Sequence, residues 1–122
     1  MPGVQTLVAV MLTHVAEGRL TLERFVDLTS AGAQRIFGIA GKGRLAVGWD
    51  ADLTLVDLNA RRTIRHADMA TRVGWTPFDG MEAKAWPMAT IIRGQVVMRD
   101  GEIAAPSQGR PIRFLENLGA EA

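Results

Sequence analysis

The sequence predicts an α+β fold in which helices come first and an antiparallel β-domain follows. From residue 4 to residue 38, apolar side chains recur at three- and four-residue spacings, which is the period of amphipathic helices. From Gly41 onward, short runs of β-branched and alternating residues are separated by Gly, Asp and Pro turns. We therefore expect residues 1–40 to form a helical segment and residues 41–122 a small β-domain, a sandwich or meander, with a C-terminal tail.

The bulk composition limits the classes of function. The chain has 122 residues, 48% of them hydrophobic, which is enough for one domain with a buried core. Its formal net charge of +1 gives no reason to expect a nucleic-acid partner. No apolar run is long enough to cross a membrane, residues 1–6 lack the positive charge of a signal peptide, and cysteine is absent. We expect a cytoplasmic protein that binds neither membranes nor nucleic acid.

Three helices are expected in the first 38 residues. The first carries an apolar stripe and ends near Gly18; its stripe comprises Val4, Leu7, Val8, Met11, Leu12 and Val15. Thr21 can cap a second helix, whose buried face would be Leu22, Phe25, Val26 and Leu28. Ser30 can cap a third helix, and Gly38 is its expected end.

The β-domain is expected to contain several short strands. Residues 52–57 alternate in the manner of a strand, and residues 61–65 predict a charged edge strand. Residues 67–87 are irregular and are expected to form a packed loop. Residues 89–92 and 95–98 predict a hairpin around Arg93 and Gly94. An Asp-Gly pair at residues 100–101 then leads into a third strand at 102–104, and a last turn is expected at 114–118.

Residue types that could carry chemistry are few, and each has a simpler structural explanation. His14 and His66 lack the third and fourth ligands that a zinc or iron site needs, so we expect a structural and a solvated histidine. Asp50, Asp52 and Asp57 could pair as acid and base, but Asp beside a strand commonly accepts backbone N–H bonds. The sequence therefore offers no catalytic residue and no metal ligand.

Other local patterns also favour structure over binding. The segment Gly41-Lys-Gly43 lacks the rest of a phosphate loop and is expected to be a turn. The basic residues Arg61, Arg62, Arg65 and His66 have no aromatic residues between them, which argues against nucleic-acid binding. The three tryptophans, Trp49, Trp75 and Trp86, are expected to pack the β-domain.

An ordered set of segments resembles a known family. The segments are Met1-Pro-Gly-Val-Gln-Thr6, Gly18-Arg-Leu-Thr-Leu-Glu-Arg-Phe-Val26, Ile36-Phe-Gly38, Val47-Gly-Trp-Asp-Ala-Asp-Leu53, Trp75-Thr-Pro-Phe-Asp-Gly80 and Thr90-Ile-Ile-Arg-Gly94. Together they are similar to the C-terminal third of cyclic amide hydrolases in the amidohydrolase superfamily. The resemblance is greatest to dihydroorotases, and allantoinases and dihydropyrimidinases are alternatives.

The resemblance implies an origin for the helices and the absence of the family's metal site. Members are (β/α)₈ barrels whose ligands, several histidines, a carboxylated lysine and an aspartate, sit at the C-terminal ends of strands. Residue 1 corresponds to a point just beyond the eighth strand, so residues 1–40 would be the last barrel helix and linker helices. All metal ligands would lie upstream, and zinc is expected only in a complete enzyme. Pro2 and Gly3 would belong to a loop next to the substrate.

Two hypotheses about function follow. The chain is either the C-terminal segment or a truncated relative of a zinc-dependent dihydroorotase, inactive alone, or a non-catalytic assembly module. Such a module would partner a pyrimidine-pathway enzyme, such as aspartate carbamoyltransferase, or complement a split hydrolase. In both cases the apolar stripe of the first helix would face a barrel that this chain does not contain. We therefore expect either a homo-oligomer or a complex with the missing N-terminal barrel segment.

Overall fold

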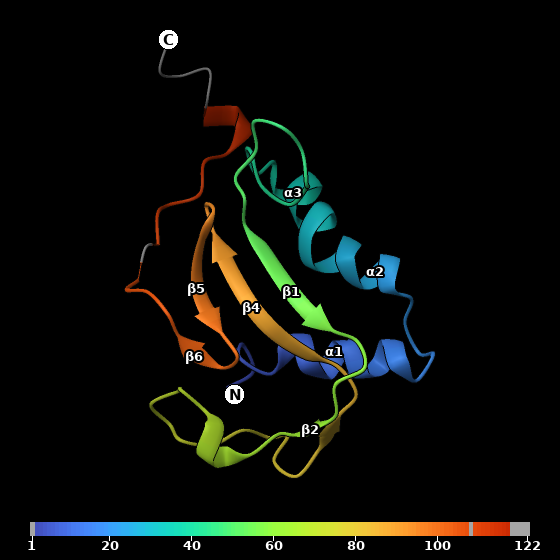
Figure 1. Ribbon diagram of the computed structural model, residues 1–122. Coiled ribbons are helices and arrows are strands. Elements are labelled where there is room, and N and C mark those ends of the chain that lie inside the picture. The colour runs from blue at the N-terminus through green and yellow to red at the C-terminus, as the bar shows by residue number, and fades with distance from the viewer. Residues whose placement is uncertain (1, 108, 118–122) are drawn as a thin grey trace. The chain divides into compact units, whose positions relative to one another are not determined.

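The computed structural model describes residues 2–107 and 109–117 (Figure 1). By their contacts the residues group into two compact units. The first unit combines Met1–Leu22 with Val56–Pro87, and the second combines Glu23–Leu55 with Met88–Ala122. The chain passes from one unit to the other three times, once near the start of a helix and twice within strands. The expected division at residue 40 concerns the domains of a larger enzyme and stays a prediction.

The first unit is a helix packed on a small sheet. Helix α1 (Leu7–Ala16) contacts strand β3 (Glu82–Ala83), which pairs antiparallel with β2 (Arg62–Thr63). The buried core of this unit is apolar and consists of Ala9, Val10, Ile64 and Ala83, with Met69, Phe78, Met81 and Trp86 packed against it. Strand β3 lies inside residues 67–87, which we had expected to be a loop, so that expectation was wrong for this stretch.

Helix α1 has apolar side chains on more than one face. The face buried in the first unit comprises Ala9, Val10, Leu12 and Thr13. The predicted stripe is therefore confirmed only in part, because its member Leu12 is buried whereas Val4 is 94% exposed and Leu7 is 50% exposed. The helix ends as predicted, because Gly18 has φ of 72° and the Arg19 N–H donates to the His14 carbonyl at 2.9 Å. A helix that is apolar all round is characteristic of one covered on both sides.

Residues 22–37 form one uninterrupted helical run, not two separately capped helices. It consists of α2 (Leu22–Val26), the π-helical turn η1 (Asp27–Ala31) and α3 (Gly32–Phe37). The expectation of a Ser30 cap was wrong, because Ser30 lies inside the π turn, where no side-chain cap bond forms. The turn is held by Asp27, whose carboxylate accepts from Arg24 at 2.9 Å and from Arg35 at 2.8 Å. Gly38, with φ of 61°, ends the run as predicted.

The buried face predicted for residues 22–28 was also wrong. Phe25 is buried, but Leu22, Val26 and Leu28 are exposed by 37%, 49% and 48%. Apolar spacing identifies which residues share a face, but it does not show whether the chain itself contains a surface to cover them.

The second unit contains most of a four-stranded sheet (Figure 1). Its strand order is β1 (Leu53–Asp57), β4 (Trp86–Ile92), β5 (Gln95–Arg99) and β6 (Glu102–Ile103). The predicted turns are present, since positive φ occurs at Arg93 and Gly94 (46° and 81°) and at Asp100 and Gly101 (52° and 89°). The expected meander is therefore confirmed, and β4 begins three residues earlier than expected.

These elements confirm the α+β class. Strand β2 agrees with the predicted edge strand, and the 3₁₀ helix η3 (Leu115–Asn117) agrees with the expected last turn, although Leu118 lies outside the described residues. A second 3₁₀ helix, η2 (His66–Asp68), follows β2. Trp86 packs on the first core as expected, but Trp75 is 44% exposed, so that part of the tryptophan prediction was wrong. A sandwich, and a barrel origin for the helices, stay predictions.

Candidate functional site

A cluster of charged side chains in the second unit surrounds the aspartates that precede β1. The Lys42 ammonium lies 2.8 Å from the Asp50 carboxylate and also bonds the Asp52 carboxylate. The other oxygen of Asp52, Oδ1, accepts the Arg93 N–H at 2.8 Å, and the neighbouring Ala51 carbonyl accepts the Gly94 N–H at 3.0 Å. Asp52 therefore fastens the β4–β5 turn to the loop that carries Lys42.

Charge and burial shift the pKa values in this cluster. Hydrogen bonds to Asp50 and then to Asp52 raise the pKa of Lys42 above its ordinary value, against an opposing effect of burial. For Asp52, burial is the largest effect and acts to raise the pKa. The bonds from Lys42 and from the Arg93 N–H together outweigh it, so the pKa of Asp52 lies below its ordinary value. Both groups are therefore held in their charged forms near neutral pH.

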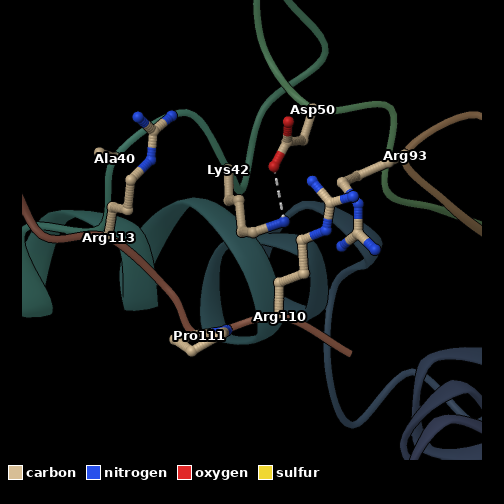
Figure 2. Close-up of a pocket in the computed structure, with 7 residues that line it drawn as sticks. All are labelled: Ala40, Lys42, Asp50, Arg93, Arg110, Pro111 and Arg113. Carbon is tan, nitrogen blue, oxygen red and sulfur yellow. Dashed lines mark ion pairs between the residues drawn. The ribbon is translucent and has the colours of Figure 1, made fainter. Parts of the chain in front are cut away.

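A cavity of about 380 Å³ opens beside this cluster (Figure 2). Its lining is largely cationic and consists of Ala40, Lys42, Asp50, Arg93, Arg110, Pro111 and Arg113. The wall that carries Arg110 and Arg113 is fixed by the backbone: Ala40 N–H donates to the Arg113 carbonyl at 2.9 Å, and Leu115 N–H to the Gly38 carbonyl at 2.7 Å. The sequence analysis did not identify Arg110 or Arg113 as site residues. Nothing in the sequence of the C-terminal loop shows that it folds back against the turn that carries Lys42.

The aspartates serve as structural acceptors, as predicted, but not always for near neighbours. Asp57 accepts the N–H of Asn59 at 2.8 Å, two residues away. Asp52 instead accepts from Arg93, 41 residues later in the chain. The charge of Asp52 is engaged by Lys42 and its pKa is lowered, which is the opposite of the raised pKa that a general acid needs.

The two histidines belong to the first unit. His14 is half-buried in α1, and its Nδ1 has no hydrogen-bond partner among the described residues. The Nδ1 of His66 accepts the Thr76 N–H at 3.0 Å and its own N–H donates to Asp79 at 2.7 Å. His66 is exposed to solvent as expected, and it also holds the 75–80 turn, a role that the sequence did not indicate.

The residues present do not fit a zinc centre. Across residues 2–107 and 109–117, no group of three or more His, Cys, Asp or Glu side chains is placed to hold a metal ion. The basic residues near β2 are likewise engaged in structure: Arg61 donates to the Lys84 carbonyl at 2.7 Å, and Arg62 lies 5.4 Å from the centre of the Trp86 ring. None of the described helices is long and apolar enough to span a membrane.

Pro2 and Gly3, the expected substrate-adjacent residues, precede α1 and are half-buried. The Gly3 carbonyl accepts the Leu7 N–H at 2.9 Å and the Thr6 hydroxyl at 3.2 Å, so this segment starts the helix. No described contact tests their proximity to a substrate, and that role stays a prediction.

Comparison with known proteins gives consistent results in sequence and in structure. The amidohydrolase family model matches residues 4–97, more than half of the chain. Dihydroorotase from Pyrococcus furiosus is 39% identical over 98% of this chain, and that from Methanosarcina acetivorans is 41% identical over 98%. These alignments take in 30% and 25% of the two relatives, so the chain spans between a quarter and a third of their length.

Solved structures of related hydrolases match the fold. The L-hydantoinase (dihydropyrimidinase) of Arthrobacter aurescens aligns with 80% of this chain at a TM-score of 0.77 and 38% identity. The D-hydantoinase of a Thermus species aligns with 87% at a TM-score of 0.78 and 35% identity. The chain covers 22% and 24% of these two structures. From the matched residues and the matched fold together, the chain belongs to the amidohydrolase family.

Proposed function

We propose that this chain is the C-terminal segment of a zinc-dependent dihydroorotase. The parent reaction is the hydrolysis of dihydroorotate to N-carbamoyl-L-aspartate in pyrimidine biosynthesis. The observation that carries the proposal is the pattern of coverage: dihydroorotases match 98% of this chain but only 25–30% of their own length is aligned. The proposal includes a cytoplasmic location, which agrees with a sequence that has no cysteine.

The proposal also holds that the chain alone does not hydrolyse dihydroorotate. Opening a ring amide at neutral pH requires an activated water and stabilisation of the charge that develops on the carbonyl oxygen. The described residues provide no cluster of metal ligands for either task. Pro2 and Gly3 would contribute at most a backbone contact next to the substrate ring. Activity would therefore depend on a barrel that supplies the metal site.

A chimera tests this role directly. The chain would replace the matching C-terminal segment of the Methanosarcina acetivorans dihydroorotase, and hydrolysis of dihydroorotate would be measured with zinc present. We expect activity in the chimera and none in this chain alone or in the truncated barrel alone. Activity of the purified chain by itself, free of host enzyme, would overturn the predicted inactivity. An equally active truncated barrel would show that the segment has no role in the enzyme.

A second candidate function, an assembly module without catalysis, is supported by exposed apolar side chains. In the second unit, Ile36 is 78% exposed, Phe37 65%, Leu45 86% and Val47 105%. Where such exposed apolar groups adjoin, as the neighbours Ile36 and Phe37 do in the chain, they favour a surface that binds another protein. Under this proposal the chain self-associates, or binds a pyrimidine-pathway enzyme or the missing part of a split hydrolase.

The oligomeric state of the isolated chain, measured by light scattering, distinguishes a self-associating assembly module from a monomeric domain. We expect a defined oligomer at micromolar concentration, and dissociation when Ile36 and Phe37 are both changed to Gln. The matched control changes the exposed Val73 and Ile103 to Gln. A wild-type chain that is monomeric at all concentrations would exclude self-association.

A further inference from the structure

The cavity beside Lys42 concentrates positive charge far beyond the average of the chain. Four cationic side chains line it, namely Lys42, Arg93, Arg110 and Arg113, while the carboxylates in and behind the lining are Asp50 and Asp52. This leaves a formal excess of two positive charges, although the whole chain has a net charge of only +1. The excess is therefore local, and it lies wholly within the second unit.

The cationic side chains of the cavity differ in whether they already form ion pairs within the protein. Lys42 is engaged by two carboxylates, and its raised pKa reflects this. In the described part of the chain, by contrast, the guanidinium groups of Arg110 and Arg113 form no ion pair within 4.0 Å. Figure 2 shows the Arg110 side chain extending toward the end of the cavity where Lys42 and Arg93 lie. Like charges that share a cavity repel one another, and a bound anion would remove that repulsion.

We propose that this cavity binds the phosphate group of a small molecule. A guanidinium presents several N–H donors in a planar fork that matches the oxygens of a phosphate, and such charge-assisted bonds are stronger than neutral ones. A phosphate dianion also balances the formal excess of two charges. The cavity volume of about 380 Å³ accommodates a phosphate together with part of the molecule that carries it.

The arrangement is partly pre-organised for such a ligand. The segment with Arg110 and Arg113 is fastened at its end by the bridge between Ile39 and Phe114 and by the Ala40 to Arg113 backbone bond. The opposite wall is fastened by Asp52, which holds the Arg93 turn. A site whose walls are already fixed loses less conformational freedom on binding than one built from free loops.

Calorimetric titration of the full chain with inorganic phosphate and with pyrophosphate tests the proposal. Sodium chloride at the same ionic strength controls for general screening. We expect saturable binding, with amide signals of residues 40, 42 and 94 shifting in NMR spectra. The variant with Arg110→Gln and Arg113→Gln should bind at least about tenfold more weakly, because two charge-assisted donors are lost. Both side chains are exposed, so the fold should be unaffected.

The matched control carries Arg65→Gln and Arg72→Gln, which remove the same charge from exposed positions in the first unit. This control should bind phosphate with wild-type affinity. Three results would each overturn the proposal: no saturable binding beyond the effect of chloride, equal weakening in both double variants, or unchanged binding after loss of Arg110 and Arg113. None of these outcomes depends on dihydroorotase activity, so the proposed function is tested separately.

Discussion

The two units of this protein are stabilised by different interactions. The first unit buries apolar side chains between α1 and the β2–β3 pair, with Ile64 fully buried at its centre. The second buries fewer large apolar side chains, chiefly Phe25, and is held by the strand pairs of its sheet, by backbone bonds between loops and by the ion pairs of Asp27 and Lys42. It also leaves large apolar groups such as Ile36 and Phe37 exposed. Burial of apolar area stabilises a fold far more than exposed ion pairs do, so loss of the Ile64 core should cost more than loss of the ion pairs of Asp27 or Lys42.

Replacing the centre of the first core should produce the largest effect. Ile64→Ala removes a fully buried side chain and leaves a cavity, which should lower the free energy of unfolding by about 2–5 kcal/mol. Ile103→Ala is the matched control; its side chain is 78% exposed and the loss should be below about 0.5 kcal/mol. Urea unfolding gives the magnitudes. Hydrogen exchange, followed separately for residues 2–22 and 56–87, should show faster exchange mainly in that unit. Equal acceleration in both units would show that they unfold together.

Substitutions at two glycines of the second unit distinguish the cost of backbone strain from the cost of steric crowding. Gly43 has φ of 86°, and a Cβ there would lie 2.9 Å from both the Gln34 Cβ and the Ser30 carbonyl oxygen. Gly48 has a similar φ of 84° with nothing within 4 Å of such a Cβ. Gly48→Ala should cost about 1–2 kcal/mol of stability from strain alone. Gly43→Ala should cost about 1–2 kcal/mol more in denaturant unfolding. Equal losses would mean that the close approach of the 30–34 helix to this turn does not constrain it.

A buried hydroxyl connects the helix and the small sheet of the first unit. Thr13 donates to the Ala9 carbonyl at 2.7 Å and accepts the Lys84 N–H at 3.0 Å. Thr13→Val keeps the shape but leaves that N–H without its partner, and should lower the unfolding free energy by about 1–3 kcal/mol. Thr54→Val, at an exposed position on β1, is the control and should change stability by less than about 0.5 kcal/mol. A neutral Thr13→Val would indicate that water replaces the lost acceptor.

The smallest effect should be the pH dependence of the Lys42 cluster. The pKa of Asp52 is lower in the folded state than its ordinary value of 3.8, so its stabilising contribution is complete above that value. The contribution is lost as pH falls through the lowered pKa. For Lys42, whose pKa is raised above 10.5, the contribution is complete below that value and is lost as pH rises through the raised pKa.

Because both side chains are partly exposed, the amplitude should be about 1 kcal/mol or less. Stability of the wild type and of Asp52→Asn would be measured by thermal unfolding from pH 2 to pH 7. The difference between the two proteins should shrink below pH 4. A difference that stays constant across this range would show that the Arg93 N–H bond, and not the charge, explains the role of Asp52.

Local sequence patterns were sufficient wherever the controlling interaction is short in range. The Asp100-Gly101 pair predicted a type I′ turn because both positions need positive φ, and Gly38 predicted the end of α3 for a similar reason. The stretch from Ser30 to Gly32 was misjudged because the helix continues through a π turn, where Asp27 pairs with Arg24 and with Arg35, eight residues later. A Cβ at Gly32 would lie 2.5 Å from the Asp27 carbonyl oxygen, a constraint that no propensity expresses.

By itself, the sequence determined the α+β class, the order of the helices and the meander, and the resemblance to amidohydrolases. Each of these follows from residue type and spacing within a few positions. Only the tertiary structure decided that Asp52 binds Arg93, that His66 holds the 75–80 turn, and that Arg110 and Arg113 line the same cavity as Lys42. The two hydrogen bonds join residues that are 41 and 10 positions apart, and the path of the loops that brings them together depends on packing that no local pattern encodes.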